Sequence, residues 1–168
     1  MLPWLQFNSK KKDTFANKNM FRTFICFLLL SPFVSMGQKT IDYNQTNGYI
    51  ADGYDVTTYF KGNPKEGSKK FITSLNGIKF KFVNQENLDL FNENPQKFSP
   101  KYGGWCAYAM GTKGEKVTVN PETYEIRNGE LYLFYNAFFT NTLEKWKEEG
   151  AEKLKVKANE HWEAIKFK

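Results

Sequence analysis

Apolar and polar residues alternate in two stretches of the chain, and an Asn-Gly pair divides each stretch. The first covers residues 70–83 around Asn76-Gly77, and the second covers residues 124–135 around Asn128-Gly129. Alternation gives a strand one apolar face and one polar face. Asn-Gly is favoured in two-residue hairpin turns because both central positions need a positive φ. The pattern therefore predicts two antiparallel β-hairpins.

Helical spacing follows the first hairpin. Leu88 and Phe91 lie three residues apart in residues 85–93, so they share one face of a helix. Asn84 before this stretch is a favoured N-cap, and Asn94-Pro95 after it ends the helix. We expect one short helix here.

The chain closes with helical sequence over residues 141–149 and 151–164, broken at Gly150. Together with the hairpins, these segments predict an α+β fold. It consists of two antiparallel β-hairpins forming a small sheet, with short helices and a C-terminal helical segment.

The formal net charge of +6 comes mostly from the N-terminus. Residues 1–37 contain five basic residues and one acidic residue, whereas residues 38–168 contain 19 basic and 17 acidic residues. In the second region the lysines are scattered among Asp and Glu and form no basic run. The charge pattern therefore argues against a nucleic-acid partner.

The N-terminal region has the pattern of a secretory signal peptide. Arg22 follows Met20, residues 24–34 are mostly apolar, and small residues precede Gln38. The apolar stretch is too short to span a bilayer, so we expect an exported, periplasmic or extracellular protein without a transmembrane segment in its mature chain. The expected organisation is an N-terminal extension and signal peptide over residues 1–37, a polar lead-in over residues 38–47, and a domain over residues 48–168.

The metal-binding residue types are few. One histidine and two cysteines exclude a zinc finger, a four-cysteine cluster and a three-histidine zinc site. Cys26 lies in the apolar stretch and would leave with the signal peptide. Cys106 would then be the one thiol of the mature chain, in a compartment where thiols are normally paired.

Cys106 lies in a distinctive stretch. Tyr102-Gly103-Gly104 predicts a tight turn that feeds a short helix, with Cys106 in its first turn and Gly111 at its end. Asp55 fits a cap of a short helical turn better than an acid catalyst. The candidate ligand-binding residues are those of the turn, together with residues elsewhere that could line a pocket: Tyr102, Gly103, Gly104, Trp105, Cys106, Tyr108, Tyr54, Asp55 and Tyr135.

Three interpretations of Cys106 follow from its chemistry. A helix N-terminus favours a thiolate, which binds a soft metal such as copper, and Met110 one turn later and the single histidine, His161, are the candidate further ligands. A thiolate could instead act in redox or nucleophilic chemistry, with His161 as its base. The third interpretation is a buried, structural cysteine, because cysteine is among the most buried residue types.

Several segments together resemble the exported YHS-domain proteins. The resemblance rests on Gly53-Tyr54-Asp55, residues 76–98, residues 102–109 and residues 128–136. Some YHS domains accompany metal-handling domains and carry cysteines after the second strand and in the helix. Here those places hold Val83 and residues such as Asn87, so that ligand set is absent. The family has no established reaction.

The sequence therefore predicts a small exported binding module. Its expected partner is a metal ion, copper or another soft metal, or a small ligand at Cys106. The alternatives are a thiol-based redox protein and a structural or protein-interaction domain. No nucleophile elbow, phosphate-binding loop or dinucleotide fingerprint argues for an enzyme.

Overall fold

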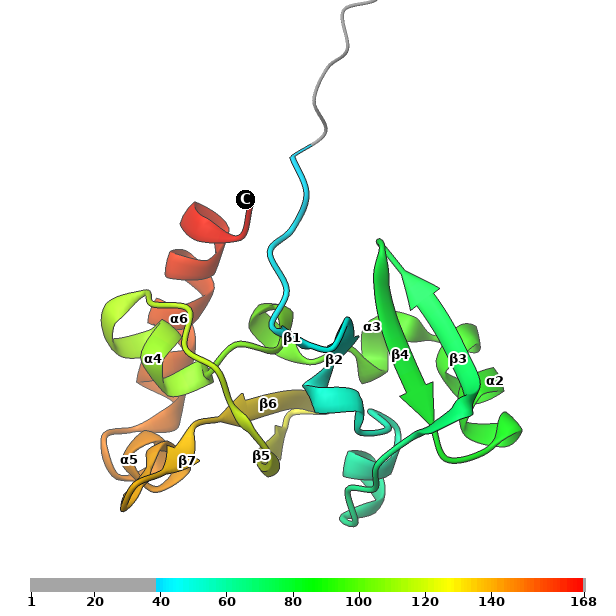
Figure 1. Cartoon of the computed structure of the whole chain (residues 1–168). Helices are drawn as coiled ribbons and strands as arrows, with labels where there is room; N and C mark the ends of the chain where they lie inside the picture. Colours follow the sequence, from blue (N-terminus) through cyan, green and yellow to red (C-terminus); the bar gives the residue numbers. More distant parts are fainter. Residues whose placement is uncertain (1–38, 168) are drawn as a thin grey trace, which may run out of the picture. The chain divides into compact units, whose positions relative to one another are not determined.

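The two predicted hairpins are present in the computed structural model, which describes residues 39–167 (Figure 1). Strands β3 (Ser68–Leu75) and β4 (Ile78–Phe82) pair antiparallel, as do β5 (Asn120–Arg127) and β6 (Glu130–Phe134). Together with the helices described in the following paragraphs, these hairpins make the fold α+β, as predicted. The hairpins do not share a sheet, because β3–β4 belongs to a four-stranded sheet of order β1-β2-β4-β3 and β5–β6 forms a separate pair.

Two further hairpins have strands of only two residues. Strands β1 (Gln45–Thr46) and β2 (Tyr49–Ile50) pair antiparallel, and β2 also pairs with β4 in parallel. Strands β7 (Asn136–Ala137) and β8 (Thr140–Asn141) form the second short hairpin. Two residues are too few to show an alternating pattern, so the sequence did not predict these strands.

The predicted helices form close to their expected bounds. Helix α2 spans Gln85–Glu93, and the side chain of Asn84 accepts a hydrogen bond from the N–H of Asn87 at 2.8 Å. A short helix, α3 (Pro95–Phe98), follows it. Helices α5 (Thr142–Glu148) and α6 (Ala151–Ile165) are separated at Gly150.

Helix α4 (Ala107–Lys113) differs from its prediction at its C-terminal end. The helix continues through Gly111 and ends at Gly114, which has the left-handed φ of 68°. A Cβ atom at Gly111 would lie 2.7 Å from the backbone oxygen of Leu154 in α6. Gly111 therefore permits the close approach of two helices and does not end one.

Strand β6 divides the interior into two apolar cores. Leu131 and Leu133 belong to a core formed with β3, β4 and α2. Tyr132 and Phe134 belong to a second core formed with α4, α5 and α6. Because successive side chains of a strand point to opposite faces, four consecutive residues of β6 contribute alternately to the two cores.

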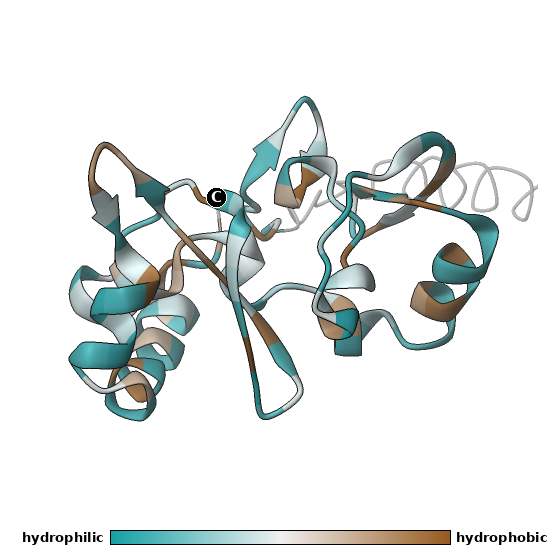
Figure 2. Cartoon of the chain, turned by 90° about the horizontal axis from the view of Figure 1, so that it is seen from below, coloured by the Kyte–Doolittle hydropathy of each residue, from teal (hydrophilic) through white to brown (hydrophobic). Residues whose placement is uncertain are grey.

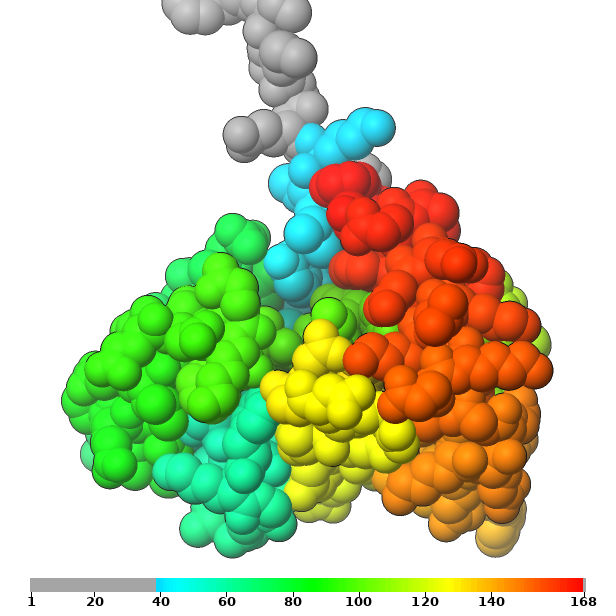
Figure 3. Space-filling view, turned by 180° about the vertical axis from the view of Figure 1, so that it is seen from behind, coloured from blue at the N-terminus to red at the C-terminus, as the bar shows by residue number. Residues whose placement is uncertain are grey.

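The expected lead-in takes part in the fold. Ile41 forms an antiparallel bridge with Phe167, and the N–H of Asp42 donates to the carbonyl of Lys166 at 2.7 Å. Figure 3 shows this segment between the β3–α2 region and the C-terminal helix. We expected the domain to begin near Gly48, but backbone hydrogen bonds include these earlier residues in the compact unit, which begins at Lys39.

The expected signal peptide, residues 1–37, lies outside the described residues and stays a prediction. Among residues 39–167, no helix is long and apolar enough to cross a bilayer.

Candidate functional site

The turn before Cys106 has an unusual backbone. Tyr102, Gly103 and Gly104 have φ values of 54°, 61° and 81°, so all three lie in the left-handed region. They belong to a 3-10 turn, η3 (Lys101–Gly104). A Cβ atom at Gly103 would lie 2.9 Å from the ring of Trp162, so this position also needs glycine for close packing.

Side chains and backbone from distant segments fix this turn. The backbone N–H of Asn44 donates to the carbonyl of Gly103 at 2.9 Å, and its side-chain amide donates to the carbonyl of Gly104 at 3.0 Å. The Tyr102 hydroxyl donates to Oδ1 of Asn159 in α6 at 3.0 Å. Burial, and then the carboxylate of Glu130, raise the pKa of Tyr102. Its hydroxyl is therefore a neutral hydrogen-bond donor.

A cleft of about 550 Å³ opens beside the turn. Its walls combine aromatic rings with amide and hydroxyl groups. The aromatic residues are Tyr43, Phe80, Tyr102 and Trp162, and the polar ones are Asn76, Gln96, Ser99, Lys101, Asn159 and Glu163, with Ile41, Leu75, Pro100 and Gly103 completing the lining. This volume and mixture of groups are typical of small-molecule sites.

The two charged side chains of the cleft wall are already paired. Lys101 donates to Oε1 of Glu130 at 2.9 Å, and Glu163 accepts a hydrogen bond from Lys166, the C-cap residue of α6. Neither leaves an uncompensated charge facing the cleft. An uncharged ligand therefore fits these surroundings better than an ion.

The structure places only part of the predicted ligand set at this cleft. Tyr102 and Gly103 line it, whereas Gly104 packs next to Ile50 behind the turn. The indole N–H of Trp105 donates to the carbonyl of Asp42 at 2.9 Å. Trp105 therefore holds the lead-in segment in place.

The other predicted aromatic residues lie apart from the cleft lining. The Tyr108 hydroxyl donates to Glu149 at 2.7 Å, and the Tyr54 hydroxyl donates to Glu122 at 3.1 Å. Tyr135 lies at the base of the β7–β8 hairpin, where its backbone makes the hydrogen bonds. These residues do not form one pocket with Tyr102.

Asp55 is a structural carboxylate. It is fully buried, and Oδ1 accepts hydrogen bonds from the N–H and the hydroxyl of Thr57 at 2.9 and 2.7 Å. Oδ2 accepts from the N–H of Val83 at 2.9 Å and the amide of Asn87 at 2.8 Å. Four donors satisfy the carboxylate, and they join the turn at η2 (Thr58–Lys61) to the end of β4 and to α2.

Cys106 is the N-cap residue of α4, and its side chain is fully buried. The N–H of Tyr135 donates to its sulfur at 3.4 Å, and the sulfur lies 3.4 Å from Oγ1 of Thr142. The Thr142 hydroxyl donates its single proton to the carbonyl of Tyr135 at 2.8 Å. With that proton engaged, the thiol is left as the donor to Thr142.

The surroundings of this thiol do not fit a copper site. The hydrogen-bonding partners of the sulfur are a hydroxyl and an N–H group, neither of which is a soft ligand. Met110 is buried in the second core, and Nδ1 of His161 lies 2.7 Å from the backbone carbonyl of Met110. Within residues 39–167, no three His, Cys, Asp or Glu side chains gather in a way that could hold a metal ion.

Sequence reasoning did not select three of the cleft's aromatic residues, Tyr43, Phe80 and Trp162. Tyr43 belongs to the segment expected to precede the domain, and Phe80 was expected only as a strand residue. The helical spacing of Asn159 and Trp162 placed both on one face of α6, which was the available signal.

No family model matches this chain, and no match was found among curated proteins or among solved structures.

Proposed function

We propose that the protein is a small binding module whose ligand site is the cleft beside Tyr102 and Gly103. The ligand class is an uncharged, ring-containing small molecule that carries several hydroxyl or amide groups, such as a carbohydrate. The observation that carries this proposal is the cleft wall, where the aromatic rings of Tyr43 and Trp162 accompany the amide groups of Gln96 and Asn159.

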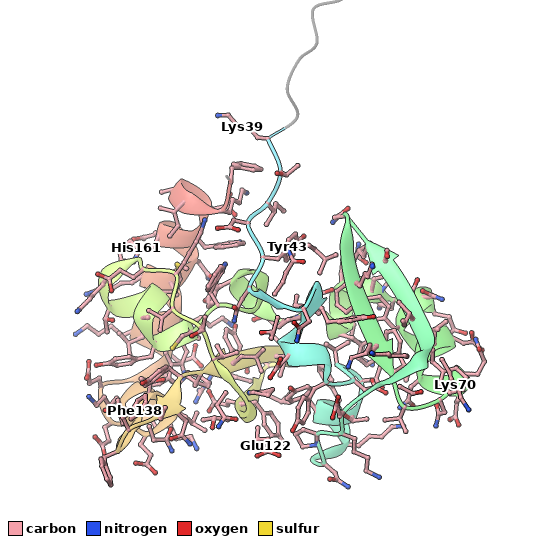
Figure 4. All side chains as sticks on the ribbon, in the orientation of Figure 1. Lys39, Tyr43, Lys70, Glu122, Phe138 and His161 are labelled. Atoms are coloured by element: carbon pink, nitrogen blue, oxygen red, sulfur yellow. The ribbon has the colours of Figure 1, made fainter. Side chains whose placement is uncertain are left out.

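The chemistry of the wall supports this ligand class. Aromatic rings offer flat apolar surfaces to the face of a ring, and amides both donate and accept hydrogen bonds at its edge. The paired states of Lys101 and Glu163 give no advantage to a charged ligand. Figure 4 shows Tyr43 on the N-terminal segment, between the β3–β4 hairpin and the region of α6.

This proposal moves the ligand away from Cys106. A fully buried thiol with two hydrogen-bond partners, the Thr142 hydroxyl and the Tyr135 N–H, favours the structural interpretation of that residue over the metal and redox interpretations. We therefore derive no metal-dependent step for this protein.

The test is a titration of the isotope-labelled full chain, followed by amide chemical shifts, with glucose, N-acetylglucosamine and maltose as probes and gluconate as the charged comparison. We expect at least one neutral sugar to shift the amides of Asn76, Gly103 and Asn159. Gln96→Ala should weaken binding about three- to tenfold, the value of one hydrogen bond. Gln45→Ala, which changes an exposed glutamine of β1 outside the cleft, is the matched control.

The proposal fails if no sugar shifts the cleft amides at millimolar concentration. It also fails if the shifts centre on Cys106 and Thr142, or if the two glutamine variants bind equally well.

Membership of the exported YHS-domain proteins, and export itself, belong to the same proposal. They are supported by the residues of the Tyr-Gly-Gly-Trp-Cys stretch and by the apolar residues 24–34 before Gln38. N-terminal sequencing of the protein from its producing cell tests export. We expect a chain that starts at or near Gln38, and an intact Met1 or Met20 would contradict processing.

A further inference from the structure

The turn between β7 and β8 departs from a rule that the other tight hairpins obey. Four two-residue hairpin turns occur among residues 39–167, and every central residue has a positive φ. Three are Asn-Gly pairs: Asn47-Gly48, Asn76-Gly77 and Asn128-Gly129. The fourth is Phe138-Phe139, with φ values of 49° and 63°.

Two phenylalanines are a poor choice for this backbone. A bulky residue with a positive φ is strained, because its Cβ atom crowds the following carbonyl oxygen. Phe138 and Phe139 are also 90% and 113% exposed, so neither packs against the fold. Figure 2 shows the hydrophobic tip of this hairpin, and Figure 4 shows Phe138 at the edge of the molecule. The fold gains nothing from these side chains, which points to a contact outside the chain.

The base of the hairpin is held firmly. The amide of Asn136 donates to Oγ1 of Thr123 at 3.0 Å, and the Thr142 hydroxyl donates to the carbonyl of Tyr135 at 2.8 Å. On the far side, Oδ1 of Asn141 accepts from the N–H of Leu143 at 3.1 Å. The two rings therefore project from a fixed support.

The chain segment that contains the tip has no charged residue. From Leu131 to Leu143 the chain contains no Asp, Glu, Lys or Arg, which makes this the longest uncharged run of the described part. The polar residues next to the tip, Asn136, Thr140 and Asn141, are neutral. The Phe138-Phe139 tip can therefore enter a medium of low dielectric without removing a charge of its own from water.

We propose that the Phe138-Phe139 tip inserts into the interface of a lipid bilayer and holds the protein at its surface. A convex apolar tip makes little contact with a flat protein surface, whereas lipid chains can surround it. The charges that follow in α5 are of both signs, with Glu144 and Glu148 beside Lys145 and Lys147. We therefore expect binding to zwitterionic lipid, without a requirement for anionic headgroups.

The test measures partition of the full chain into sucrose-loaded phosphatidylcholine vesicles by sedimentation. The main variant is Phe138→Asn/Phe139→Gly, which installs the pair used by the other three turns and so should fold at least as stably as the wild type. We expect its partition coefficient to fall at least about tenfold. Val156→Ser removes another exposed apolar side chain, on α6, and should bind like the wild type. All three chains carry the same apolar residues 24–34, so only the tip differs between the wild type and the main variant.

A second measurement locates the tip. We expect the tryptophan introduced by Phe138→Trp to be quenched by brominated phosphatidylcholine, whereas the one introduced by Val156→Trp should not be. The proposal is overturned if the main variant binds vesicles as well as the wild type, or if the two introduced tryptophans are quenched equally. It is also overturned if the wild type ignores vesicles and the main variant changes only the self-association of the protein, which would assign the tip to a protein pocket.

Discussion

The thiol of Cys106 donates a hydrogen bond to the hydroxyl oxygen of Thr142, 3.4 Å away and 36 residues later in the chain. The Thr142 hydroxyl donates a hydrogen bond to the carbonyl of Tyr135, and the N–H of Tyr135 donates one to the sulfur. This closed ring of three hydrogen bonds joins the start of α4 to both ends of the β7–β8 hairpin. A cysteine that was the leading candidate for reactivity thus supports the exposed Phe138-Phe139 tip.

The ring predicts an inert thiol in the folded protein. Cys106 should react with a water-soluble disulfide reagent only after unfolding, because its sulfur is fully buried. Thr142→Val removes the acceptor of the thiol proton and should lower the free energy of unfolding by about 1–3 kcal/mol. Urea denaturation measures this loss, and Thr140→Val on the neighbouring strand is the control. Rapid modification of Cys106 in the native protein would contradict the closed ring.

Replacing the glycine of an Asn-Gly turn should lower the stability of the protein through backbone strain alone. Gly77 and Gly129 have φ values of 80° and 76°, and a Cβ atom at either would meet nothing within 4 Å. Gly77→Val and Gly129→Val should each destabilise the protein by about 1–2 kcal/mol through backbone strain. Ser74→Val, at an exposed position within β3, should have an effect below about 0.5 kcal/mol in the same thermal unfolding assay. Equal stabilities for all three variants would contradict the turn geometry.

Replacing Gly111 with alanine should destabilise the protein, although this change normally stabilises a helix. Alanine is a better helix former than glycine by about 1 kcal/mol, so Gly→Ala inside a helix normally stabilises. Here the added methyl group would lie 2.7 Å from the backbone oxygen of Leu154. We expect Gly111→Ala to destabilise by about 1–3 kcal/mol in chemical denaturation, because α4 and α6 must separate to accommodate it. Lys113→Ala, an exposed site in the same helix, should be nearly neutral, and a stabilised Gly111→Ala variant would show that the helices approach less closely.

Glu130 predicts a loss of stability in acid. Partial burial raises its pKa, but hydrogen bonds from Tyr132, Lys101 and Lys155 outweigh burial and lower the pKa to about 2 from an ordinary 4.5. A lowered pKa means that the stabilisation is complete above pH 4.5 and is lost as the pH falls toward 2. Since 34% of the side chain is exposed, solvent screening reduces the contribution to about 1 kcal/mol.

Glu130→Gln isolates this effect. We expect the melting temperature of the variant to fall less steeply than that of the wild type between pH 5 and pH 2. Glu144→Gln changes an exposed carboxylate of α5 and serves as the control. Parallel curves for the wild type and Glu130→Gln would show that Glu130 does not contribute to the acid transition.

Local patterns predicted the longer elements of this fold. Asn76-Gly77 and Asn128-Gly129 marked both long hairpins, and Asn84 marked the start of α2, because turns and caps depend on neighbours in the chain. The cleft was not predictable in this way. It brings Tyr43, Phe80 and Trp162 together from three distant segments. The spacing of residues within one segment cannot reveal such long-range contacts.

The difference between local patterns and long-range contacts also explains why the sequence could not decide whether Cys106 is buried. Its position at the start of a helix was predicted, but its burial depends on Thr142 and Tyr135, which reach it across the fold. No hairpin was predicted at Asn47-Gly48, because the strands on either side of this turn are too short to show an alternating pattern.

The bridge between Ile41 and Phe167 brings the two ends of the folded unit side by side. A short flexible linker could therefore join them at a small loop-closure entropy. New ends could then open at an exposed turn such as Asn128-Gly129, where a Cβ atom would meet no neighbour. In such a permuted chain β5 and β6 would become the two terminal strands, although they lie between the two cores. The β5–β6 pair would then have to form between the two most distant parts of the chain. This would slow folding without removing a native contact.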